Sequence, residues 1–191
     1  MTEFDSDEPD YAERIAGHSD VHQDAWIRTL EDMAAMAEEL EAEGWDVITI
    51  ASGDTATENP DVGQTDRFGL VYVIPGNKAA EFEPAFEAGT WPQYKVFRQE
   101  VSNRVFIVTQ FLDPETETAI LLAGTFEMRH APGLIVTALE EDEMYTYVQK
   151  LDGTVVGTFR HEDYELFFPN AEKYRGYFDD EDGDADEPAA E

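Results

Sequence analysis

The chain has 191 residues, with 12 Lys and Arg against 44 Asp and Glu, and a net charge of −32. It contains no cysteine, which excludes disulfides, thiolate metal sites and cysteine nucleophiles. Hydrophobic residues make up 42% of the chain, which is enough for one folded core. No apolar run reaches the ~20 residues of a membrane-spanning helix, so we expect no membrane partner.

The acidic residues are spread over the whole chain. Residues 1–13 hold six acids and residues 179–191 hold eight, and neither segment has a base. Residues 14–178 keep 30 acids and all 12 bases, so the folded part is expected to be acidic as well. At molar salt, charges are screened within about 3 Å. We therefore interpret the acidity as adaptation to a halophilic cytoplasm. Since no basic cluster exists, nucleic acid is not expected as a partner.

Composition divides the chain into three parts. Residues 1–18 are predicted to be a disordered acidic arm, and residues 179–191 a disordered acidic tail, because such segments bury too little apolar surface to fold. Residues 19–178 are predicted to form a single domain.

The first half predicts two helices and two strands. A helix over 22–43 follows from an apolar stripe at helical spacing, with Gly44 as its cap. Strands are expected over 45–50 and 68–74, separated by a polar loop, 52–67, of a length that is typical of functional or mobile segments. A helix over 77–88 contains Pro84, so it is expected to be kinked or to begin later. The stripe of the first helix is Trp26, Leu30, Met33, Ala37 and Leu40.

The second half predicts a run of hairpins. In the strands over 104–112 and 117–128, odd-numbered and even-numbered positions are both mostly apolar. Since these positions face opposite sides of a strand, the pattern indicates central strands covered on both faces. Pro132 opens a short helix, and Asp152-Gly153 is a two-residue hairpin turn. An aromatic segment, 163–178, is expected to pack back on the sheet. The complete set in this half is strands over 93–101, 104–112, 117–128, 144–151 and 154–160, with a helix over 132–140.

This order predicts an α+β fold in one domain. Consecutive strands joined by short turns indicate a mostly antiparallel sheet of about six or seven strands, with helices packed on it.

Three stretches carry a resemblance to a known family: GLVYVIPGNKAAEF (69–82), LDPETETAILLAG (112–124) and HAPGL (130–134). Over most of residues 22–170 the chain resembles a family of uncharacterised acidic cytoplasmic proteins from halophilic archaea, a domain of unknown function. The resemblance implies a source and no activity, since none of these stretches is a catalytic motif.

The best candidate site lies where predicted strands end. Glu127, Arg129 and His130 follow a central strand and precede a helix, a place where sites are often built. Arg129 suits a carboxylate or phosphate, and His130 suits proton transfer near neutral pH. Arg160 and His161 end the last strand in the same way. The two groups would share one rim if both strand ends lie on one side. Arg98, beside apolar neighbours, is the remaining candidate ligand-binding residue.

Three other patterns are weaker. His18 and His22 have the spacing of a helical metal pair, but the Glu of the zinc-protease motif is missing. Lys78 follows a strand–helix turn without the glycine spacing of a phosphate loop. Asp66, Gln93 and Lys95 resemble the arrangement of a metal-dependent nuclease, although a helix intervenes and Gln93 is not an acid. Each has a structural interpretation that we favour.

The sequence therefore predicts a non-enzymatic binding or regulatory module without a cofactor or metal. Its partner would be an unidentified protein or small molecule, and a homodimer through a sheet edge or the aromatic segment is possible in this interpretation. The alternative is an enzyme of small substrates that uses the Arg/His cluster. A metal-dependent nuclease is the weakest alternative. No Gly-x-Ser-x-Gly motif is present.

Overall fold

The computed structural model describes residues 8–62 and 65–178, with side chains described from residue 19 onward. Residues 1–7 of the predicted arm and the whole predicted tail lie outside these ranges. The fold is α+β, as predicted, but its eight described strands form two sheets of four. Sheet A has the order β1-β6-β5-β4: β1 (Asp46–Ala51), β6 (Thr118–Glu127), β5 (Arg104–Asp113) and β4 (Gln93–Val101). Sheet B has the order β2-β3-β7-β8: β2 (Asp54–Glu58), β3 (Gly69–Ile74), β7 (Met144–Lys150) and β8 (Val155–His161).

The prediction of one mostly antiparallel sheet is wrong, for two physical reasons. First, the segment read as a loop contains β2, a short polar strand without the apolar alternation that identifies strands. Second, β1 pairs with β6 and β3 pairs with β7, both in parallel. Both sheets are therefore mixed. These pairings join strands far apart in the chain, which local turn signals do not reveal.

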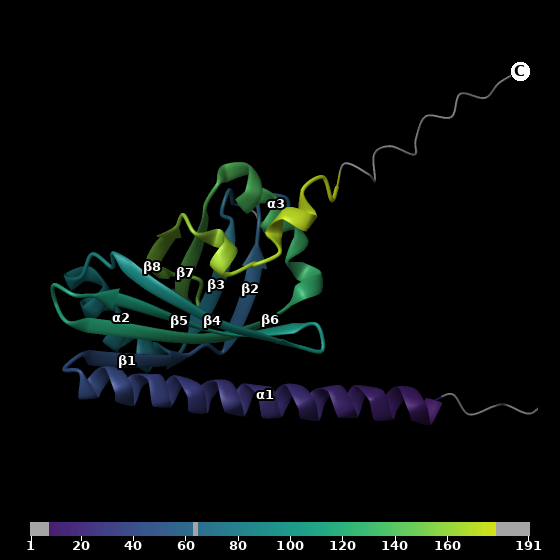
Figure 1. The fold of residues 1–191 in the computed structure, drawn as a ribbon, viewed down its shortest axis with the longest axis horizontal. Coiled ribbons are helices and arrows are strands. Elements are labelled where there is room, and N and C mark those ends of the chain that lie inside the picture. The colour runs from purple at the N-terminus through teal and green to yellow at the C-terminus, as the bar shows by residue number, and fades with distance from the viewer. Residues whose placement is uncertain (1–7, 63–64, 179–191) are drawn as a thin grey trace, which may run out of the picture.

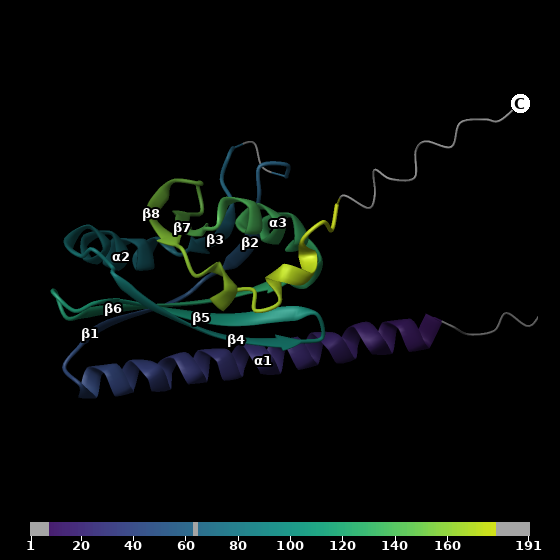
Figure 2. The same ribbon diagram turned by 45° about the horizontal axis from the view of Figure 1, so that its top comes forward.

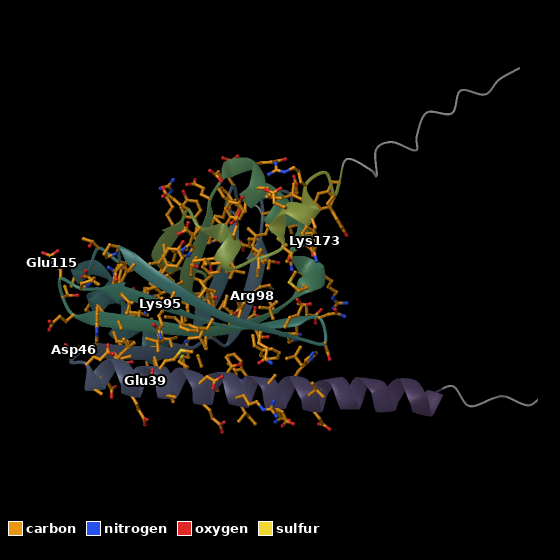
Figure 3. The ribbon with its side chains drawn as sticks, viewed as in Figure 1. Glu39, Asp46, Lys95, Arg98, Glu115 and Lys173 are labelled. Atoms are coloured by element: carbon orange, nitrogen blue, oxygen red, sulfur yellow. The ribbon has the colours of Figure 1, made fainter. Side chains whose placement is uncertain are left out.

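Helix α1 (Glu8–Ala42) lies along the outer face of sheet A (Figures 1 and 2). The predicted apolar stripe is confirmed: Met33 and Ala37 are buried against β5 and β6, and the rest of the stripe is partly buried there. The helix ends at Ala42, and Gly44, the predicted cap, follows with a φ of +95°. The Trp45 amide bonds to the Leu40 carbonyl at 3.0 Å, the pattern of a glycine-terminated helix end. The helix begins earlier than the predicted residue 22 and enters the segment expected to be an arm. Side chains project from its other face, away from the sheet (Figure 3).

Between the sheets lies the main core. Central strands β5 and β6 are buried on both faces, as predicted, because α1 covers one face and sheet B the other. Helices α2 (Gly76–Ala88) and α3 (Pro132–Glu141) contribute to this core at opposite edges of sheet B, α2 beside β8 and α3 beside β2 (Figure 2). α2 begins at Gly76 and continues through Pro84, so the predicted later start is wrong. The C-terminal aromatic segment packs back on the core, as predicted. Its 3₁₀ turns are Tyr164–Leu166 and Ala171–Tyr174.

The two sheets meet at a corner where the chain passes from β1 to β2. The Ser52 amide bonds to Ala123 of sheet A at 3.0 Å, and the Gly53 amide bonds to Val73 of sheet B at 2.9 Å. Beside this corner lies Gly124 of β6. A Cβ atom there would lie 2.5 Å from both the Thr55 hydroxyl and the Tyr72 ring. Only a residue without a side chain therefore allows the sheets to approach this closely.

Within the described residues, no helix is both long enough and apolar enough to cross a membrane.

We predict that Gly124→Ala destabilises the protein by about 1–3 kcal/mol, the usual cost of overpacking a core. Gly76→Ala is the matched control, because a Cβ at Gly76 has no heavy atom within 4 Å. Denaturant unfolding in a fixed KCl concentration measures both. Equal midpoints for the two variants would show that the close approach at Gly124 does not constrain the fold.

Candidate functional site

A cavity of about 820 Å³ lies beside the free edge of β2. Among the described strands β2 pairs with β3 alone, and its other edge faces the end of β6, the 3₁₀ turn Met128–His130 and the start of α3. Tyr177 and Phe178 line the same cavity. We call it the β2 cavity; its lining consists of Asp54, Thr55, Ala56, Thr57, Asn59, Asp61, Val62, Arg104, Thr125, Phe126, Glu127, Arg129, His130, Pro132, Gly133, Tyr177 and Phe178.

Three of the six predicted site residues line this cavity: Glu127, Arg129 and His130. Glu127 ends β6 and lies directly opposite Arg104 in the β5–β6 pairing. Its carboxylate accepts a hydrogen bond from Arg104 Nη2 at 2.8 Å through Oε1, and its other oxygen pairs with Arg129 Nε. Burial raises the pKa of Glu127, but the charges of Arg129 and Arg104 outweigh it and hold that pKa below its usual value. Glu127 is therefore an ionised bridge between two cations.

His130 is positioned through its backbone. Its carbonyl accepts a hydrogen bond of 2.7 Å from the Thr57 hydroxyl, which joins β2 to the turn before α3. The His130 side chain is exposed, as is Arg129, whose side chain is 74% exposed. Both side chains are thus accessible to a molecule that enters the cavity from solvent.

The other three predicted residues lie elsewhere. Arg160 and His161 are neighbours on β8, and successive residues of a strand point to opposite faces. Arg160 therefore lies on the exposed face, where it pairs with Glu143 and, at 2.9 Å, with Glu162. His161 is fully buried inside. The structure thus does not place Arg160 and His161 on one rim with Arg129.

Arg98 occupies a third place, on β4. Its side chain is half-buried, with Glu100 at 4.0 Å, and burial lowers the pKa of its guanidinium. It lines a small hollow with Lys173 and Tyr174 of the C-terminal segment. Figure 3 shows Lys173 on that segment, outside the sheet that carries Arg98.

Sequence reasoning missed several residues of the β2 cavity. Arg104 could have been found from the sequence. The predicted hairpin of strands 104–112 and 117–128 brings the start of the first strand next to the end of the second, where Glu127 lies. Asn59 and Thr57 lie in the stretch that was read as a loop, where only its length indicated function. Asn59 is 2% exposed, and its Oδ1 accepts the amide of Asp61 at 3.0 Å.

His161 belongs to an aromatic cluster instead. Its ring centroid lies 4.6 Å from those of Tyr94 and Phe167, and its Nε2 is 2.8 Å from the Thr146 hydroxyl. It borders a separate cleft of about 420 Å³, whose walls include Trp91 and Phe159. Burial lowers the pKa of His161 to about 3, so the imidazole is neutral at physiological pH.

The residues of the weaker alternatives, the nuclease arrangement and the histidine pair, are not brought together in one site. Asp66 lies between β2 and β3 of sheet B, whereas Gln93 and Lys95 lie on β4 at the edge of sheet A. His22 lies 3.2 Å through Nε2 from the Val101 carbonyl, and the His18 side chain lies outside the described part. In the described side chains, no group of three or more His, Asp or Glu is placed to hold a metal ion.

Residues 12–169 match a family of unknown function, DUF7529. The chain belongs to this family. The match covers most of the domain, including β2, the Arg104–Glu127 pair and the start of α3. No curated protein matches the chain, and no solved structure matches it. The family assignment therefore carries no activity to the β2 cavity, and the halophilic source stays a prediction.

We predict that His161 makes the protein less stable as the pH falls from 6.5 toward 3. The unfolded chain binds a proton at His161 near pH 6.5, whereas the folded chain does so only near pH 3. At pH 4.5 this difference removes about 2–3 kcal/mol of the free energy of unfolding. His161→Phe keeps an aromatic ring in the cluster and removes the titration.

The measurement is the free energy of unfolding of both proteins at pH 7 and pH 4.5 in the same salt. Because acidic side chains titrate equally in both, the difference between the two proteins isolates His161. Between pH 7 and pH 4.5, the wild type should lose about 2–3 kcal/mol more of its free energy of unfolding than His161→Phe does. Parallel pH curves would show that the buried imidazole accepts a proton without cost.

Proposed function

We propose that this protein is a non-enzymatic module that binds a small molecule in the β2 cavity. The observation that carries the proposal is the cavity itself: about 820 Å³ lies within the range of small-molecule sites, ~300–1,000 Å³. Its walls mix apolar surface with a few convergent polar groups, as such sites do. A halophilic cytoplasm, inferred from the charge, is the proposed setting.

An enzyme of small substrates is the second candidate. The observation that favours it is the presence of Arg129 and His130 in one cavity, since an exposed imidazole beside a guanidinium suits proton transfer near an anion. Against it, Arg129 is paired to Glu127, and the other predicted pair, Arg160 and His161, is absent from this cavity. The two candidates differ in the effect of His130→Gln, which removes turnover in an enzyme and leaves binding intact in a binding module.

We predict that protein purified in molar KCl carries a small molecule in the β2 cavity. Ala56→Trp places a large ring in the cavity from an exposed position, so the fold tolerates it. Ala35→Trp, on the exposed face of α1, is the matched control. Mass spectrometry of molecules released by denaturation should find the same compound with the wild type and with Ala35→Trp, and at least tenfold less of it with Ala56→Trp.

Equal amounts of the compound from all three proteins would contradict this location. If no compound is released from any of them, the proposal that the purified protein carries a ligand is wrong.

A further inference from the structure

The start of α3 forms one wall of the β2 cavity. The helix begins at Pro132, and Pro132 and Gly133 both line the cavity. The preceding residue, Ala131, has no side-chain cap to offer, and the first turn carries no acid. The first amides of a helix have no acceptor within it, and the helix dipole adds partial positive charge there. This end of the helix therefore favours an anion, but it does not by itself make a site.

Asn59 supplies an independent observation. Its side chain is almost fully buried and lines the cavity, and its Oδ1 is occupied by the Asp61 amide. The other end of the amide, Nδ2, has no acceptor among the described residues. A Cβ atom on Gly133 would lie 2.3 Å from this nitrogen, so Nδ2 lies directly against the start of α3. Because this amide lines the cavity, an anion bound at this point would accept a hydrogen bond from Nδ2.

The charges on the same side of the cavity agree with an anion. Arg104 and Arg129 share the single carboxylate of Glu127, which leaves an excess of one positive charge. A guanidinium has five N–H donors, so both side chains keep donors for a ligand. Asp54 and Asp61 also line the cavity. Their carboxylates disfavour a molecule that carries negative charge along its whole length.

We propose that the ligand of the β2 cavity is a small organic anion with one carboxylate or phosphate group. This group lies between the start of α3, the Asn59 amide and Arg129, and the uncharged or cationic remainder of the ligand extends along β2 toward Asp54. The inference rests on the proposed function, since it assumes that the cavity binds a small molecule.

The test is titration of the full chain, followed by amide NMR, with three probes at one fixed KCl concentration. Lactate presents a carboxylate, glycerol 3-phosphate presents a phosphate, and glycerol is the neutral control. The expected result is a saturable shift of the Asn59 side-chain amide and the Gly133 backbone amide with lactate or glycerol 3-phosphate, and none with glycerol. The anion with the tighter affinity identifies the group that the ligand carries.

Three variants complete the test. Asn59→Asp keeps the acceptor for the Asp61 amide and replaces the donor by a negative charge, and Arg129→Gln removes a mostly exposed cation. Both should weaken the affinity for the anion at least tenfold. Arg28→Gln, on the exposed face of α1, should leave it unchanged. Equal shifts with glycerol, no saturable shift with either anion, or unchanged affinity in Asn59→Asp would overturn the inference.

The two proposals fail in different ways. If the compound released from the purified protein is neutral or cationic and is lost in Ala56→Trp, small-molecule binding holds and the anion inference is wrong. If no compound is released and no probe gives a saturable shift, both are wrong.

Discussion

The close contact between the two sheets at Gly124 is the constraint on which the rest of the structure depends. β6 reaches Thr55 and Tyr72 of sheet B only because Gly124 has no side chain. The short connection through Ser52 and Gly53, which bonds to both sheets, fixes the chain at the same corner. β2 is thereby held at the edge of sheet B, with the end of β6 and the start of α3 beside it. The β2 cavity follows from this geometry, because no strand in residues 8–62 or 65–178 pairs with the second edge of β2.

Charged side chains of both signs line the β2 cavity. The chain has 44 acids and 12 bases, yet two arginines and one histidine converge with a single shared glutamate at one wall. The lowered pKa of Glu127 keeps that glutamate ionised, so it fixes both guanidiniums in place. Asp54 and Asp61 also line the cavity, so the positive charge is confined to the wall formed by Arg104, Glu127 and Arg129.

Much of the fold could be predicted from the sequence because its signals are local. The apolar stripe from Trp26 to Leu40, the strands β5 and β6 with apolar residues on both faces, and the hairpin at Asp152-Gly153 each depend on neighbours in the chain. The hairpin connection spans three residues, 151–153, and not the two that were predicted, because the Lys150 amide bonds to the Thr154 carbonyl. The division into two sheets could not be predicted, because the parallel pairs β1–β6 and β3–β7 depend on contacts distant in sequence. β2 was missed because Asp54–Glu58 is polar and lies at an edge.

The residues of the β2 cavity could be predicted only where they are close together in the sequence. Glu127, Arg129 and His130 are adjacent in sequence, so their convergence needed only the end of one strand. Arg160 and His161 are also adjacent, but the alternation of β8 turns one outward and buries the other. Asn59 and Gly133 come together only in three dimensions, across the space between β2 and α3.

The most direct test of the central claim is a crystal structure of the full chain, purified and crystallised in molar KCl without an added ligand. The account predicts density for an organic molecule in the β2 cavity, with an oxyanion group near Asn59 and Gly133. A cavity that holds only water, while an organic molecule lies in the aromatic cleft beside Trp91 or elsewhere, would contradict it.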